Sequence, residues 1–377
     1  MDAVPMSRNG TGNRNQDIGR YLRANRLKYV MIAVALLALA VLFIYSLYLG
    51  STAVTLDQIF GNIFGDDGTW EGYVIHDIRL KRSVAALIAG CGLGVAGAMM
   101  QCVLRNPLGS PYTLGLSNAA AFGAALGIMV LGGGLVNGGA VASYRIDEPY
   151  IVAISAFAFS MLATAVIVAA MKFFGASPAT MVLAGMAISS IFSAGIAFLQ
   201  YQANEMALSA IVFWQFGDLE KISWAQMPII FWAVLIPLVY IYLNRWSLNA
   251  IDQGDEVAQS LGVRVGRTRV TVLVLSAVMT SVIVSFVGII GFIGLLAPHV
   301  ARRLVGDDKN ILIPASAVIG SMVLLIAMMV SQNAFGFVIP VGIITSMIGG
   351  PMFLWILFDS RTKKKKRIAE FVRRVRA

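Results

Sequence analysis

Long apolar runs separated by short polar segments dominate this chain. A helix needs roughly 20 apolar residues to cross the hydrocarbon core of a bilayer, and ten segments of about that size are bounded by charge or by Gly/Pro turns. They are residues 29–49, 83–104, 113–134, 149–172, 180–200, 226–243, 270–286, 289–304, 311–331 and 339–358. The pattern predicts an all-α integral membrane protein with about ten transmembrane helices.

The run 270–304 is the one place where the number of crossings is ambiguous. It reads either as one long tilted helix or as two shorter spans folded at Gly288 and Gly291. Arginines flank both ends, at Arg264, Arg267 and Arg269 before the run and at Arg302 and Arg303 after it. Because basic residues favour the cytoplasmic side, both ends are expected there. An even number of crossings follows, although a shallower hairpin stays open.

Composition agrees with a membrane protein and leaves no room for a soluble domain. Of 377 residues, 58% are apolar and 13% are charged, against about 45–50% and about 25% in soluble domains. The formal charge of +10 is gathered in short clusters between spans and at both ends, which indicates membrane orientation rather than nucleic-acid binding.

Three regions and a localisation follow from this charge pattern. Residues 1–28 are expected to be a basic, disordered cytoplasmic tail, 29–358 the transmembrane domain, and 359–377 a second basic cytoplasmic tail attracted to anionic lipid. Both termini are therefore predicted to be cytoplasmic, in a multi-pass protein of the cell membrane. The loop between the first two spans is acidic and is predicted to lie outside.

Several kinds of chemistry have no candidate residues. The chain has no Gly-Lys dipeptide and hence no phosphate-binding loop, so it cannot hydrolyse nucleotide alone. His76 and His299 have no Cys or carboxylate at metal-ligand spacing, and Cys91 and Cys102 form no disulfide framework. Neither a metal nor a cofactor is predicted.

Three function classes remain at this point: a transport subunit driven by a partner, a secondary carrier or channel that works alone, and a membrane-embedded enzyme. None of the 19 acidic residues falls inside a predicted span, which argues against an ion-coupled carrier. The missing nucleophile motif argues against the enzyme. The partner-driven subunit is the first hypothesis.

Four segments are polar, charged or turn-forming where a plain span would be apolar. They are Arg79-Leu80-Lys81-Arg82, Arg105 to Pro111 with Leu114 to Asn118, Gly254 to Val263, and Gly288 to Asp308. Bases on the outer side favour a bound acidic partner, with snorkelling at the interface as the alternative. Prolines and glycines entering an apolar helix indicate irregular backbone that must be covered by protein or line a cavity.

The third of these segments predicts a short amphipathic helix. Val257, Ala258 and Leu261 are expected on one face, and Gly262 would close the helix as its C-terminal cap. A lone surface helix is the alternative. The position of this helix in the longest internal cytoplasmic segment favours contact with a cytoplasmic motor.

Taken in this order, the segments resemble the FecCD-type permeases, the membrane subunits of ATP-driven importers for iron–siderophore, haem and cobalamin. The resemblance covers about residues 30 to 358 and rests on six motifs in sequence. These are R-L-x-R, N-P-L-x-x-P, L-G-x-S-N, G-x-E-x-A-x-x-L-G, G-F-I-G-L-x-x-P-H-x-x-R and I-P-V-G-x-x-T-x-x-I-G-x-P.

The resemblance implies a type II ABC importer permease fold with ten helices, working as a homodimer with the pathway at the subunit interface. Two cytoplasmic ATP-binding subunits and one extracytoplasmic substrate-binding protein would complete the importer. It assigns binding-protein docking to Arg79, Arg82 and position 332, occupied by Gln332; ATPase coupling to Gly254, Asp255, Glu256, Ala258, Leu261 and Gly262; and gate or pathway positions to Asn106, Leu108, Gly115, Ser117 and Asn118.

The outer end of this chain departs from the family pattern. Met328 and Gln332 stand where an Asp and an Arg are usual, and Val338 replaces the usual Glu. A third outer arginine is therefore missing, and Lys81 partly compensates between the other two. The cargo is expected to be a ferric siderophore, with a corrinoid, haem or an oxyanion as alternatives.

Overall fold

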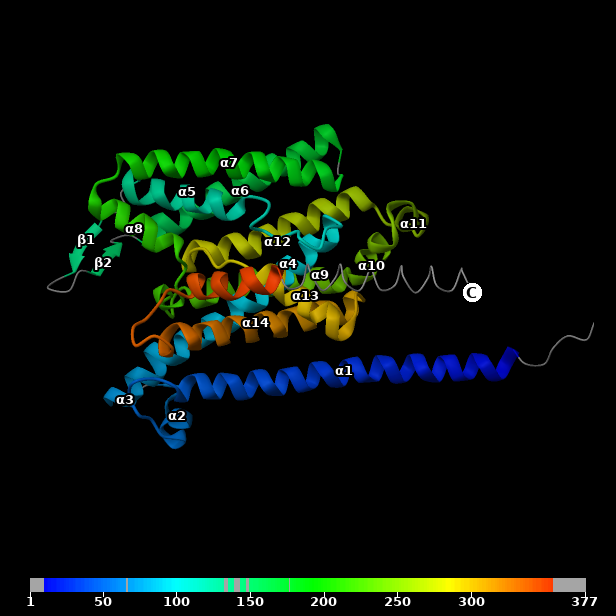
Figure 1. The fold of residues 1–377 in the computed structure, drawn as a ribbon, viewed down its shortest axis with the longest axis horizontal. Coiled ribbons are helices and arrows are strands. Elements are labelled where there is room, and N and C mark those ends of the chain that lie inside the picture. The colour runs from blue at the N-terminus through cyan, green and yellow to red at the C-terminus, as the bar shows by residue number, and fades with distance from the viewer. Residues whose placement is uncertain are drawn as a thin grey trace, which may run out of the picture.

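The computed structural model describes residues 10–354 except 66, 132–134, 139–142, 147–148 and 176. Most helices run along the long axis of the molecule (Figure 1). In chain order they are α1 Gly10–Tyr48, α2 Leu56–Asn62, α3 Trp70–Tyr73, η1 Val74–Leu80, α4 Lys81–Val103, α5 Leu116–Met129, α6 Pro149–Phe174, α7 Pro178–Gln202, α8 Glu205–Gln215, η2 Leu219–Lys221, α9 Met227–Leu243, α10 Arg245–Gln253, α11 Asp255–Ser260, α12 Val265–Val287, α13 Ile293–Val305 and α14 Lys309–Asn333. A helix at Val341–Leu354 follows α14.

Each of the ten predicted spans contains one of these helices, and the all-α membrane fold is confirmed. Six helical stretches in the described part of the chain are long and apolar enough to cross a membrane: Arg26–Tyr48, Trp70–Val103, Pro149–Phe174, Pro178–Gln202, Val265–Val287 and Lys309–Asn333. A seventh is the pair α9 and α10, bent by 62°.

Three predicted spans are shorter than expected. They correspond to α5, α13 and the helix Val341–Leu354. The run 270–304 does fold at Gly288, whose φ of +83° suits glycine, but only its first half is a full-length helix. A Cβ at Gly288 would lie 2.3 Å from the carbonyl oxygen of Trp214, so close backbone packing sets the position of the break.

Other elements differ from the sequence expectation. α1 begins at Gly10, inside the segment 1–28 that is expected to be disordered. Residues 20–28 are mostly Arg, Leu, Ala and Lys, which favour a helix, and they continue directly into the apolar span. The second span starts at Trp70 rather than residue 83, through α3 and the π-helical η1. α8 was not predicted, nor was the antiparallel pairing of β1 Leu135–Gly138 with β2 Ser143–Ile146. The tail 359–377 lies outside the described residues.

α4 is the central helix, and small residues let α14 approach it closely. A Cβ at Gly90 would lie 2.5 Å from the oxygen of Gly320, and one at Gly94 would lie 2.3 Å from the oxygen of Ser316. These contacts leave no room for side chains. The larger apolar residues Met99, Met279 and Leu324, from α4, α12 and α14, fill the core around them.

The two ends of the molecule carry different elements (Figure 1). α10, α11 and the N-terminal half of α1 lie at one end of the long axis, whereas α2, α3 and the hairpin lie at the other. Only 11% of the apolar window of α1 is buried, so this helix offers most of its surface to lipid.

Candidate functional site

Arg79 lies in η1 and is buried, with 2% of its surface exposed. Its guanidinium donates hydrogen bonds to the carbonyl oxygens of Leu47 at 2.8 Å, Tyr48 at 3.0 Å and Thr52 at 2.6 Å. Since the last carbonyls of a helix lack partners within it, Arg79 caps the end of α1. The guanidinium is thus buried and bonded to backbone oxygens of its own chain, and the docking role expected for Arg79 stays a prediction.

Arg82 and Gln332 meet at an acidic residue that sequence reasoning missed. Arg82 Nη1 lies 3.3 Å from Glu220 Oε1, and Gln332 Nε2 donates to the same oxygen at 3.2 Å. Burial, with a contribution from the charge of Asp218, raises the pKa of Glu220, against the opposing effect of Arg82. Two of the three expected docking positions, Arg82 and Gln332, therefore meet at Glu220 of η2.

The segment Gly254–Val263 contains the predicted short helix, as α11, with the predicted cap. Gly262 has a φ of +81°, its N–H donates to Gln259 O at 2.9 Å, and the N–H of Val263 donates to Ala258 O at 2.9 Å. This pair of bonds is a Schellman motif.

The predicted apolar face of α11 needs one correction. Val257 and Leu261 are 44% and 68% exposed, but Ala258 is fully buried against Ile251 and Val265. The reason is the helical period, which sets adjacent residues 257 and 258 about 100° apart. Ala258 attaches α11 to its own chain, while Val257 and Leu261 are left facing outward.

Asp255, at the start of α11, joins two other parts of the chain. Arg269 of α12 binds both of its carboxylate oxygens, at 3.0 Å and 2.8 Å. Arg105, just beyond α4, reaches it with Nη2, which also donates to Ile251 O at 2.8 Å. α11 is thus held to α4 and α12 by charge-assisted hydrogen bonds.

The turn after α4 is a second Schellman motif, but with arginine where glycine is usual. Arg105 N–H donates to Cys102 O at 3.1 Å and Asn106 N–H to Gln101 O at 3.2 Å. Arg105 has a φ of +45°, a conformation that costs a side-chain-bearing residue roughly 1–2 kcal/mol. Asn106 then closes the next turn, accepting from Leu108 N at 3.0 Å.

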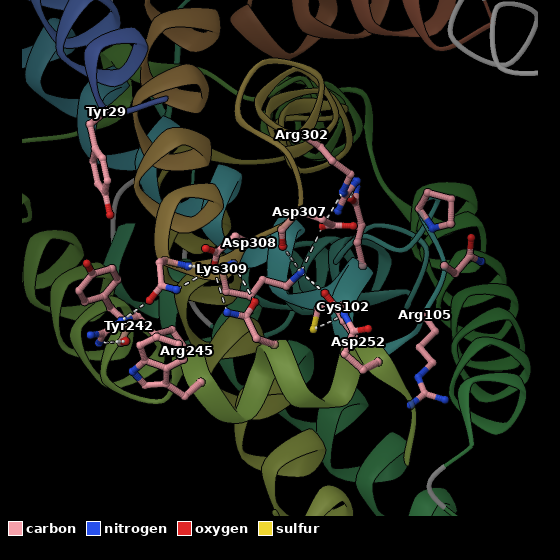
Figure 2. Close-up of a pocket in the computed structure, with 17 residues that line it drawn as sticks. Tyr29, Cys102, Arg105, Tyr242, Arg245, Asp252, Arg302, Asp307, Asp308 and Lys309 are labelled. Carbon is pink, nitrogen blue, oxygen red and sulfur yellow. Dashed lines mark hydrogen bonds and ion pairs between the residues drawn. The ribbon is translucent and has the colours of Figure 1, made fainter. Parts of the chain in front are cut away.

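A polar cavity of about 950 Å³ opens between α1, the end of α4, α10 and the start of α14. Figure 2 shows Lys309 directed toward Asp252, with Asp307 and Arg302 close by. Lys309 is 1% exposed and binds Asp252 and the oxygens of Asp307. Arg302 Nε donates to Asp307 at 2.9 Å. Burial alone would raise the pKa of Asp307, but the hydrogen bond from Arg302 and the charge of Lys309 outweigh it and lower that pKa.

A second hollow, of about 520 Å³, has a mostly apolar lining without a charged side chain among the described residues. Asn118, Gln215, Phe216, Phe292 and Ser346 contribute to its wall. Gln215 Nε2 is buried and has no hydrogen-bond partner within the described part of the chain.

Close backbone contacts build this wall. A Cβ at Gly342, in the I-P-V-G motif, would lie 2.0 Å from Phe216 O and 2.5 Å from Ile289 O. Gly342 N–H donates to Gly217 O at 3.2 Å. The motif glycine therefore lets three distant segments meet around the hollow.

The predicted gate and pathway residues do not lie together: some lie at or near the second hollow and others lie at or near the polar cavity. Asn118 Nδ2 donates to Ser189 Oγ at 2.6 Å and lines the second hollow, as just described. Gly115 begins α5 with a φ of +75°, and Ser117 is buried. Asn106 instead lines the polar cavity, and Leu108 is 38% exposed.

Residues 36–359 match the model of the FecCD transport family. The chain belongs to this family. An ABC transporter permease protein of Methanocaldococcus jannaschii is 42% identical over 342 residues, covering 90% of this chain and 97% of the relative. A permease protein of an Fe(3+)-citrate import system of Bacillus subtilis is 33% identical over 340 residues, covering 89% and 97%.

The fold of this FecCD chain is similar to a solved structure described as an inward-facing conformation of a metal-chelate type ABC transporter. The TM-score is 0.74 at 28% identity, covering 88% of this chain and 99% of the other. The all-α membrane fold and the family resemblance are confirmed together. Glu220, Asp252 and Lys309 were not found from sequence, because an isolated charge near a span end has no periodicity that marks its partner.

Proposed function

We propose that this chain is the membrane-spanning subunit of an ATP-driven importer that carries a metal chelate, a ferric siderophore in the first place. The family match over residues 36–359 carries the transport function, and the relative of an iron-citrate system supports the class of cargo. Corrinoid, haem and oxyanion cargo are the alternatives.

The second hollow is proposed as half of the pathway. Its lining without charged side chains among the described residues suits a bulky chelate, which fixed charge would retain. Two copies related by a twofold axis would join two such hollows, so the working unit is a homodimer.

The energy comes from two cytoplasmic ATP-binding subunits that contact α11. Val257 and Leu261 are exposed apolar side chains on this helix, and burying them in a groove of the partner supplies a hydrophobic contact. Asp255 and Gly262 fix the start and end of the helix, while Gly254 and Glu256 complete the coupling segment. The termini and α11 are then on the cytoplasmic side.

An extracytoplasmic substrate-binding protein docks at the opposite end, at Arg82 and Gln332. Both side chains contact the chain's own Glu220, so a carboxylate of the binding protein would compete with Glu220 for Arg82. Arg79 contributes indirectly, by holding the end of α1 next to this surface.

Gene deletion with uptake of labelled cargo tests this function. Loss of ferric-siderophore uptake, with cobalamin uptake retained, is the expected result. Loss of cobalamin uptake alone would replace the siderophore with a corrinoid as cargo, and loss of neither would exclude both classes and point to haem or an oxyanion.

A further inference from the structure

In the turn after α4, Arg105 has a left-handed backbone conformation that glycine would adopt without strain. Arg105 occupies the left-handed position of its Schellman motif, with a φ of +45°. At the end of α11 the equivalent position is Gly262. Because the turn itself needs no side chain at this position, Arg105 is retained for what its guanidinium contacts.

Among the described residues, that guanidinium makes its hydrogen bonds to the coupling region. Arg105 Nη2 binds Asp255, the first residue of α11, and donates to Ile251 O of α10 at 2.8 Å. Asp255 is held independently by both terminal nitrogens of Arg269, whose side chain is 3% exposed. The link of Asp255 to α12 therefore does not depend on Arg105, which binds an Asp255 that is already oriented.

The turn that follows Arg105 is held together by hydrogen bonds of its own. Asn106 accepts from Leu108 N through its side chain at 3.0 Å and from Gly109 N through its backbone oxygen at 2.9 Å. These bonds leave Asn106–Gly109 little internal freedom. A displacement at Arg105 is therefore passed to Leu108 rather than absorbed between them.

We propose that Arg105 is a positioning residue, through which Asp255 of the coupling helix sets the position of the gate turn Asn106–Leu108. The inference rests on the proposed function, in which α11 contacts the ATPase and this turn borders the cytoplasmic gate. When the ATPase moves α11, Arg105 carries the movement to the turn.

Thiol labelling at the turn in the complete complex tests the link. Leu108→Cys is introduced into the chain, assembled with its ATP-binding subunits in liposomes, and the labelling rate is compared between the nucleotide-free and the vanadate-trapped states. The chain without this substitution gives the blank for Cys91 and Cys102. We expect the two rates to differ by about fivefold or more, and by less than about twofold after Arg105→Gly, which keeps the turn conformation but removes the tie.

Two further variants separate positioning from a structural role. Arg105→Lys keeps a cation and is expected to restore part of the difference in rate. Arg267→Gln removes an exposed arginine of α12 and should leave the difference and basal ATP hydrolysis unchanged.

Three outcomes would overturn the inference. The first is a wild-type difference in rate after Arg105→Gly. The second is that the Arg105→Gly complex loses its ATP-binding subunits, or melts at a much lower temperature than the Arg267→Gln complex, because Arg105 would then be stabilising the fold. The third is equal rates in the parent complex while ATP-driven uptake persists, which would remove the turn from the gate and leave the proposed function standing. Absence of ATP-driven uptake in the parent complex would instead refute the proposed function itself.

Discussion

Replacing Arg79 with methionine separates a structural role of this residue from a docking role. The substitution keeps an apolar chain of similar length but leaves three carbonyl oxygens, of Leu47, Tyr48 and Thr52, without their donor. A hydrogen bond to a charged group contributes about 1.5–3 kcal/mol net, so the three together imply a loss of about 3 to 5 kcal/mol after partial rehydration. At about 2 °C per kcal/mol for a chain of this size, the melting temperature should fall by about 6 to 10 °C.

The assay is the fraction of monodisperse protein that remains after heating in detergent. Lys81→Met, which removes the neighbouring half-buried cation, is the matched control and should melt within about 2 °C of the parent, as most substitutions away from buried networks do. An Arg79→Met variant with parental thermal stability that no longer responds to the binding protein would refute the capping role. Arg79 would then act at the docking surface, as the family resemblance implied.

Three other predictions follow from the proposed contacts. Leu261→Asp places a charge on the exposed apolar face of α11, so the ATP-binding subunits should be lost during purification in detergent; recovery at the parental ratio would contradict the coupling contact. Arg82→Glu should abolish stimulation of ATP hydrolysis by the binding protein. Glu220→Gln removes the negative charge that pairs with Arg82 inside the chain and should lower the concentration of binding protein needed for half-maximal stimulation; unchanged values in both variants would assign these residues to internal packing alone. Single cysteines at Ser51, Ser247 and Ser360, in a chain without Cys91 and Cys102, should react with an impermeant thiol reagent in intact cells only at Ser51, and the reverse pattern would invert the topology.

Hydropathy and charge located the spans well because crossing a bilayer imposes a length and a composition that single sequences display. The same reasoning started the second span late, at residue 83. Arg79, Lys81 and Arg82 lower the apolar content of that window, although the backbone is helical from Trp70. What lets a helix carry these charges is a set of contacts from distant segments, such as the carbonyls at the end of α1 and Glu220.

In the candidate site, too, some features were predictable from sequence and others were not. The cap at Gly262 was predictable because a local motif requires it. The left-handed conformation of Arg105 and its link to Asp255 were not, because each depends on how α10 and α11 fold back onto α4 and α12. Sequence therefore indicated which segments carry function, and the tertiary contacts determine what each residue in them does.

ATP-driven uptake in proteoliposomes tests the central proposal most directly. The chain is reconstituted with its ATP-binding subunits and supplied with the binding protein and a labelled ferric siderophore, with ATP on the side that carries α11. Accumulation that requires hydrolysable ATP, and that is absent from liposomes holding this chain alone under a proton or sodium gradient, is the predicted result. Accumulation by the chain alone under such a gradient would contradict the account and identify a secondary carrier.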